Sequence, residues 1–198
     1  MEKKKRSVLL IFIFTCLISL FNTSLGYSED DPLFSESYTK AKKLSAQLSS
    51  EEKVGQLFLI TFDEKEAGDT TEIFDLISNY HVGGVILKSE NGNIPQNGDT
   101  LQELNSLIGD LQKIKWDDED QLKPISEVGL INSYIPLFIG ISQPGGSFPY
   151  DQIINGLTPT PSQMAIGATW NTSAAENVGE LIGIELSAIG FNLFFGPS

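Results

Sequence analysis

The sequence of 198 residues has few of the side chains on which metal, redox and phosphate sites are built. It contains one cysteine, one histidine (His81), and 13 Lys and Arg residues against 26 Asp and Glu residues. One cysteine excludes a disulfide framework and a site made of several thiolates. A histidine-based zinc site or a Ser-His-Asp triad would have to be built around His81 alone. The formal charge of −13 argues against nucleic acid as a partner, because phosphate binding needs clustered lysines and arginines.

Long apolar runs are also scarce, and the longest lies at the N-terminus. Four basic residues at 3–6 precede fourteen uncharged residues, Val8–Phe21, and Ser24 and Gly26 then occupy the −3 and −1 positions of a cleavage site. This pattern predicts a signal peptide at 1–26, cleaved near Gly26, and a secreted or cell-envelope protein. The alternative is an uncleaved membrane anchor, although fourteen residues fall short of the about 20 that span a bilayer. Beyond this segment we expect no contact with the membrane.

The remaining chain alternates apolar runs with helical patterns. A polar leader at 27–47 is compatible with a helix from Ser35 onward, and Ser49 predicts the N-cap of a short helix. Further helical spacing occurs at 71–80, 100–114 and 174–189. Apolar runs predict four buried strands, at Val54–Phe62, Gly83–Leu87, Ile135–Ile141 and Phe191–Phe195.

The alternation of strands and helices predicts an α/β fold with a parallel sheet, because parallel neighbours are joined by crossovers. The strands lack polar alternation, so we expect burial of both of their faces. Two architectures remain open, a doubly wound open sheet and the beginning of an eight-stranded (β/α)₈ TIM barrel. No Gly-x-Gly-x-x-Gly or Gly-x-x-x-x-Gly-Lys motif follows any strand, which counts against the nucleotide-binding open sheets.

An acidic stretch near 115–124 fits neither pattern. Asp117, Asp118, Glu119 and Asp120 follow one another directly, which suggests either a calcium loop or a solvated insertion. The oxygen spacing of a calcium loop is missing, so we predict the insertion and no metal site.

Five segments in order carry a resemblance to a known family: 48–58, 80–87, 135–141, 161–169 and 190–197. Together they resemble the N-terminal domain of glycoside hydrolase family 3, in its β-N-acetylglucosaminidase branch. The resemblance implies that 48–198 forms the first half of a (β/α)₈ barrel, about four βα units. It also implies exo-acting, retaining hydrolysis of O-glycosyl bonds in β-glycosides, of the β-N-acetylhexosaminidase or β-glucosidase type, in carbohydrate or cell-wall metabolism. The partner would be a carbohydrate, and no cofactor is implied.

The chain departs from the family pattern at its sugar-binding motif. Ser142-Gln143-Pro144-Gly145-Gly146 stands where the family has Asp-Gln-Glu-Gly-Gly, and 147–150 lacks the expected arginine. The Lys-His pair, the acid/base loop and the aspartate nucleophile of the family would follow later strands. We therefore expect the catalytic half outside these 198 residues, assign no catalytic residue, and expect the chain alone to be inactive.

Candidate substrate-binding residues follow from the position of strand ends, because barrels gather their functional groups at the carboxyl face. These candidates are Asp63, Ser142, Gln143, Gly145 and Gly146. Since His81 precedes the second strand, we predict a structural role for it. A half barrel exposes two strand edges and an apolar face, which predicts self-association. Two alternatives remain: a non-catalytic sugar-binding relative, in view of Ser142, and a half-barrel scaffold that pairs with another chain.

Overall fold

The computed structural model describes residues 32–121 and 134–196, so the predicted signal peptide lies outside the described residues. The chain divides into two compact units between Ala46 and Gln47. The described part of the first unit, 32–46, is helical and belongs to helix α2 (Pro32–Gln47), which confirms the helix expected from Ser35 onward. On its surface the Lys40 ammonium lies 2.7 Å from the Glu36 carboxylate, one helical turn away. The hydrogen bond and the charge of Lys40 lower the pKa of Glu36.

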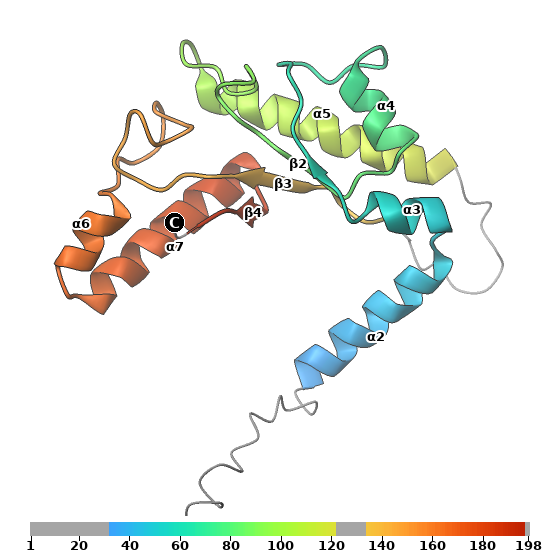
Figure 1. The fold of residues 1–198 in the computed structure, drawn as a ribbon, viewed down its shortest axis with the longest axis horizontal. Coiled ribbons are helices and arrows are strands. Elements are labelled where there is room, and N and C mark those ends of the chain that lie inside the picture. The colour runs from blue at the N-terminus through green and yellow to red at the C-terminus, as the bar shows by residue number, and fades with distance from the viewer. Residues whose placement is uncertain (1–31, 122–133, 197–198) are drawn as a thin grey trace, which may run out of the picture. The chain divides into compact units, whose positions relative to one another are not determined.

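The second unit alternates helices and strands as the sequence predicts (Figure 1). The strands form one sheet in the order β1-β2-β3-β4, and all three neighbouring pairs are parallel. Consecutive strands are therefore neighbours throughout. The strands are β1 (Leu59–Ile60), β2 (Gly84–Ile86), β3 (Phe138–Ile141) and β4 (Leu193–Phe194). The helices are α3 (Ser50–Gly55), α4 (Glu72–Ser78), α5 (Thr100–Gln121), α6 (Gln163–Ala168) and α7 (Thr172–Ile189).

Several helices have an N-cap residue whose side chain accepts a hydrogen bond from a backbone amide of the first turn. Ser49 and Glu52 form a reciprocal capping box at α3, as expected from the sequence. The Thr71 hydroxyl accepts from the Phe74 amide at the start of α4, and the side-chain Oδ1 of Asn171 accepts from the amides of Ser173 and Ala174 at the start of α7. Helix α7 ends at Gly190, whose φ of 117° requires a residue without a side chain.

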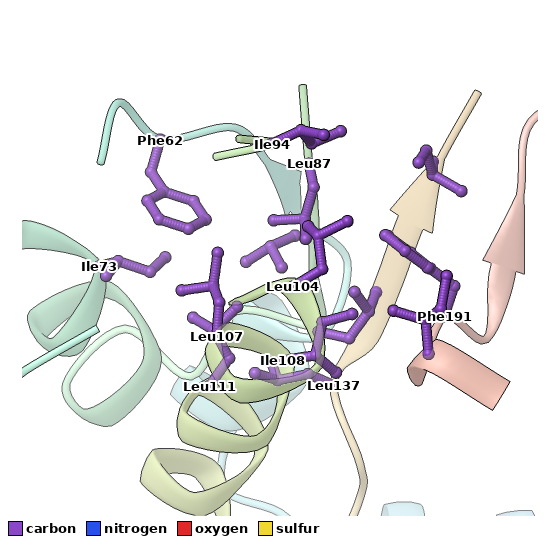
Figure 2. Packing of buried hydrophobic residues seen from close by; sticks show 14 of the residues in the cluster. Phe62, Ile73, Leu87, Ile94, Leu104, Leu107, Ile108, Leu111, Leu137 and Phe191 are labelled. Carbon is purple, nitrogen blue, oxygen red and sulfur yellow. The ribbon is translucent and has the colours of Figure 1, made fainter. Parts of the chain in front are cut away.

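The core lies on one face of the sheet (Figure 2). Val85, Leu87, Ile139 and Ile141 are fully buried there. The side chains that cover them come from three helices: Ile73 and Ile77 of α4, Leu104, Leu107, Ile108, Leu111 and Ile114 of α5, and Leu186 and Ile189 of α7. A doubly wound sheet carries helices on both faces, whereas the wall of a barrel carries them on one. Of the two open architectures, the described residues therefore match the barrel.

The opposite face of the sheet is apolar and exposed. Leu59, Gly84 and Phe138 are register partners on neighbouring strands and so point to the same side. Leu59 is 41% exposed and Phe138 is 49% exposed. The expectation that both strand faces are buried is therefore wrong for the residues that the structure describes. The half-barrel expectation of an exposed apolar face agrees with these values.

Two element boundaries differ from the sequence prediction. In the run Val54–Phe62, helix α3 continues to Gly55 and only Leu59–Ile60 is strand. Leu57, Phe58 and Leu59 of this run are exposed, and Leu59 lies on the uncovered face of the sheet. The acidic stretch is not separate from its helix, because α5 continues to Gln121. Neither Gly nor Pro interrupts 115–121, and the Lys113 ammonium pairs with the Asp117 carboxylate.

Helix α6 was not predicted, since its sequence has no marked periodicity; the Ser162 hydroxyl caps it. Within 32–121 and 134–196, no helix has the length and hydropathy of a membrane span. The same residues contain no cluster of three or more Asp, Glu, His or Cys side chains that could hold a metal ion.

Candidate functional site

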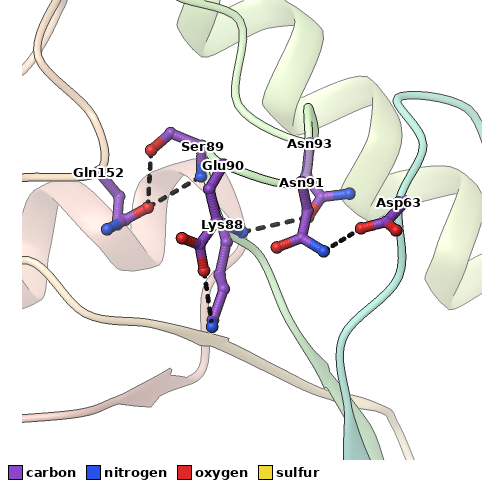
Figure 3. Close-up of polar contacts among 7 residues, drawn as sticks. All are labelled: Asp63, Lys88, Ser89, Glu90, Asn91, Asn93 and Gln152. Atoms are coloured by element: carbon purple, nitrogen blue, oxygen red, sulfur yellow. Dashed lines mark hydrogen bonds and ion pairs between the residues drawn. The ribbon is translucent and has the colours of Figure 1, made fainter.

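The loops after β1, β2 and β3 leave the same edge of the sheet, because the strands are parallel (Figure 3). Asp63 follows β1 and is exposed. Its Oδ1 atom accepts a short hydrogen bond from the side-chain amide of Asn91, which lies in the loop after β2. The predicted candidate Asp63 is thereby held against the neighbouring loop.

Asn93 holds the same two loops together from the inside. Its side chain is buried, with 1% exposure. Its amide nitrogen donates to the carbonyls of Phe62 (3.0 Å) and Glu64 (2.6 Å), and its carbonyl accepts from the Lys88 amide (3.1 Å). Sequence reasoning missed Asn93. The Asn-Gly-Asn sequence at 91–93 signals a turn, but it does not reveal that one amide bonds two loops.

The loop after β2 is also bonded to the loop after β3. Both the backbone amide (2.8 Å) and the hydroxyl (2.9 Å) of Ser89 donate to Oε1 of Gln152. Beside them, the Lys88 ammonium lies 2.9 Å from the Glu90 carboxylate, which offsets part of the negative charge of this edge. Hydrogen bonds therefore connect the three loops from Asp63 to Gln152.

Gln143 is a candidate that the structure places inside the loop after β3. It is 5% exposed. Its amide nitrogen donates to the Ile153 carbonyl (2.8 Å), and its Oε1 accepts from the amides of Gln152 and Ile153 (3.0 Å each). This side chain positions the 152–153 backbone. The neighbouring Ser142, at the end of β3, is half-buried.

Gly145 and Gly146 form a turn that a buried carboxylate holds in place. Their φ angles are 84° and 95°, and that of Ser147 is 60°. Asp151, only 8% exposed, accepts from the amides of Gly145 (2.7 Å) and Ser147 (2.8 Å), and the Gly146 amide donates to the Thr160 carbonyl (2.9 Å). The amides of this turn bind groups of the chain itself, so the turn is not an anion cradle. Sequence reasoning missed Asp151, which has no spacing signature.

Two hollows lie beside these loops. One of about 30 Å³, next to Gln143, Ser147 and Asp151, has room for water only. The other, of about 310 Å³, lies at the end of β1 and reaches the lower size range of small-molecule pockets. Its lining is rich in carboxylate and hydroxyl oxygens: Thr61, Phe62, Asp63, Glu64, Glu72, Ile73, Leu76 and Asn91. Oxygen acceptors of this kind suit an uncharged ligand that donates hydrogen bonds through hydroxyl groups.

His81 lies at the opposite end of the strands, before β2. Its φ is 53°, and its carbonyl accepts from the side-chain amide of Gln56 (3.1 Å). This position agrees with a structural role in the turn that enters β2.

A parallel sheet with helices on one face and polar loops at its carboxyl edge defines a TIM-barrel-like α/β protein. Residues 49–198 match the model of the "Glycosyl hydrolase family 3 N terminal domain". The chain therefore belongs to glycoside hydrolase family 3, and the resemblance noted in the sequence is confirmed.

Individual relatives agree with this assignment. Beta-hexosaminidase A of Pseudoalteromonas piscicida is 32% identical over 181 residues, covering 81% of this chain and 27% of the relative. Beta-N-acetylglucosaminidase/beta-glucosidase of Cellulomonas fimi is 28% identical, covering 77% of this chain and 21% of the relative. The chain thus spans about a quarter of the length of these relatives.

Solved structures show the same fold. A family 3 beta-N-acetylglucosaminidase from Paenibacillus sp. str. FPU-7 superimposes with a TM-score of 0.60 at 31% identity, over 76% of this chain and 24% of that chain. NagZ from Neisseria gonorrhoeae, in complex with N-trifluoroacetyl-D-glucosamine, gives a TM-score of 0.51 at 23% identity, over 70% of this chain and 35% of that chain. The second match shows the fold alone.

Proposed function

We propose that this chain is the first half of the (β/α)₈ barrel of an exported family 3 glycosidase that hydrolyses O-glycosyl bonds in β-glycosides. The observation that carries the proposal is the family match over 49–198, on a sheet whose carboxyl-edge loops are bonded to one another. The names of the relatives favour substrates that contain N-acetylglucosamine or glucose. The role in carbohydrate or cell-wall metabolism follows from the same names.

Within this proposal the described loops bind the sugar, and the residues that cleave the glycosidic bond follow later strands of the barrel. Asp63 and Ser142 would offer oxygens to sugar hydroxyls, and the backbone at Gly145 and Gly146 lets a ring approach closely. Gln143 would support this surface from below, since its amide bonds the 152–153 backbone. A retaining glycosidase needs a nucleophilic carboxylate and an acid/base about 5–5.5 Å apart. We assign neither role to a residue of this chain.

The test is to read the coding DNA beyond codon 198 and to express the whole open reading frame. We expect a frame that encodes a Lys-His block and a later aspartate, and a product that releases nitrophenol from nitrophenyl N-acetyl-β-glucosaminide or nitrophenyl β-glucoside. The 198-residue chain serves as the control and should release none. A stop codon directly after codon 198 would exclude the proposal.

Export forms a separate part of the proposal and rests on the pattern at 1–26. Fusion of these residues to a periplasmic reporter should direct its secretion with cleavage after Gly26, and Lys3–Arg6 replaced by Gln should reduce that secretion. Retention of the uncleaved fusion in the membrane would favour the anchor instead.

A non-catalytic sugar-binding relative is the second candidate, and it is favoured by the departure from the family motif at Ser142. A neutral hydroxyl still bonds a sugar hydroxyl, but it lacks the about 1.5–3 kcal/mol that a hydrogen bond to a charged group contributes. Binding of chitobiose by the complete gene product without turnover would select this candidate over the glycosidase.

A further inference from the structure

The loop after β3 carries two large aromatic side chains that face solvent. Phe148 is 75% exposed and Tyr150 is 66% exposed. Soluble proteins bury most of such rings, and grouped exposed ones mark binding surfaces. They stand in the segment 147–150, directly after the Gly145–Gly146 turn at the carboxyl edge of the sheet.

The backbone that carries these rings is fixed. The Tyr150 and Asp151 amides donate to the Ser147 carbonyl (2.9 Å and 3.1 Å), and the buried Asp151 carboxylate binds the amides of Gly145 and Ser147. The loop is thus closed on itself by four hydrogen bonds between 145 and 151. Two exposed rings on a fixed backbone lose little conformational freedom when they bind a ligand.

The negative charge of the chain and its carboxylate oxygens indicate which class of ligand these rings would bind. An acidic chain of formal charge −13, with Asp63, Glu64 and Glu72 around the hollow at the end of β1, disfavours an anion. A pyranose ring presents apolar C–H groups on its faces and hydroxyl donors around its rim. Aromatic ring faces pack against the C–H groups of the sugar, and carboxylate oxygens accept hydrogen bonds from its hydroxyls.

We propose that Phe148 and Tyr150, on the loop after β3, form an aromatic surface on which a sugar ring of a β-linked oligosaccharide stacks, at the same carboxyl edge of the sheet as the polar loops after β1 and β2. This inference rests on the proposed function and adds to it the recognition of an oligosaccharide through its apolar ring faces. Phe148 and Tyr150 are binding residues with no part in bond cleavage.

The test is a calorimetric titration of the full chain with chitotriose and, in parallel, with cellotriose. We expect Phe148→Ala and Tyr150→Ala each to weaken binding by about three- to tenfold, the range of one aromatic contact. Tyr150→Phe keeps the ring and should bind as the wild type does. Tyr80→Ala is the matched control, because Tyr80 is 62% exposed but lies at the opposite end of the strands, before β2.

The outcomes separate this inference from the proposed function. Wild-type binding that neither Ala variant weakens overturns the aromatic surface and leaves the glycosidase proposal standing. An equal loss in Tyr80→Ala also overturns it, because the effect is then not local. Wild-type chain that binds neither sugar overturns the inference, while the glycosidase proposal is still decided by the whole open reading frame. If both Ala variants abolish self-association in light scattering and leave sugar binding unchanged, the surface binds a second copy and the inference is wrong.

Discussion

Replacement of Asp151 by Ala should destabilise the chain more than replacement of any exposed aspartate. The carboxylate accepts two short bonds, from the amides of Gly145 (2.7 Å) and Ser147 (2.8 Å), at 8% exposure. Each bond to a charged group contributes about 1.5–3 kcal/mol, and the two are not additive because they share one side chain. We therefore expect a loss of about 3–4 kcal/mol in the free energy of unfolding, or about 10 °C in Tm for a chain of this size.

The assay is urea unfolding of the full chain, followed by circular dichroism at fixed pH. Asp69→Ala is the control, since Asp69 is exposed in the loop before α4, and its effect should stay within about 0.5 kcal/mol. Asp151→Asn keeps the size but turns one acceptor into a donor that faces a backbone N–H, so at least half of the loss should remain. If Asp151→Ala unfolds at the same urea concentration as Asp69→Ala, the carboxylate does not hold the turn and the reasoning is refuted.

Three further predictions test other parts of the chain. Asn93→Ala removes a buried amide that bonds three backbone groups, so urea unfolding should show a loss of about 2–4 kcal/mol, whereas an unchanged midpoint contradicts this role. Gly145→Ala introduces strain at a φ of 84° and a Cβ 2.4 Å from the Pro161 carbonyl oxygen. The same assay should therefore show a loss of about 1–3 kcal/mol in the free energy of unfolding. Glu36 has a pKa lowered below its ordinary 4.5 by Lys40, so its contribution to helix α2 is present above that pH and is lost as the pH falls through the lowered pKa. An NMR titration of the Glu36 carboxyl carbon measures it, and Lys40→Gln should return the midpoint to the ordinary value.

The sequence predicts the order of elements well because each helix and strand has a local cause. Ser49 supplies a cap, and Gly190 supplies a left-handed end for α7. The buried positions of α5 recur at helical spacing, so the periodic pattern at 100–114 was read correctly. The periodic pattern does not show that α5 continues to Gln121. The acidic residues beyond 114 are compatible with a helix and with a loop, so their composition does not distinguish the two.

Strand boundaries and strand exposure could not be predicted in the same way. The apolar run Val54–Phe62 contains a helix end, a turn and a two-residue strand, and composition does not distinguish them. Whether an apolar strand is covered on both faces depends on elements elsewhere in space. Phe138 has an apolar sequence environment and is nevertheless half exposed, because the helices of the second unit cover the other face of the sheet.

The candidate site shows the same division between local and long-range causes. Strand-end reasoning places the candidates at one edge of the sheet, and the parallel topology agrees with this placement for all of them: Asp63, Ser142, Gln143, Gly145 and Gly146. It could not separate residues that face a ligand from residues that hold a loop. Gln143 resembles a sugar-binding side chain in sequence, yet its amide bonds the 152–153 backbone across ten residues. Asn93 bonds the carbonyls of residues 29 and 31 positions away, and no local motif encodes contacts over that separation. Asp151 bonds amides four and six positions away, in an arrangement without a spacing signature.

This internal bonding has a chemical consequence for the loop after β3. The amides of Gly145, Gly146 and Ser147 already bind Asp151 and Thr160, so these three donors are not available to an anionic ligand. Ser142 supplies a neutral hydroxyl at the position where the family pattern noted in the sequence has an aspartate. Within the proposed function, charged acceptors for sugar hydroxyls would come from the hollow at the end of β1, which is lined by Asp63, Glu64 and Glu72. Under that proposal, recognition would combine these acceptors with apolar contact from the loop after β3. The combination requires both loops to keep a fixed spacing, and the bonds from Asp63 to Asn91 and from Ser89 to Gln152 connect them through the loop after β2.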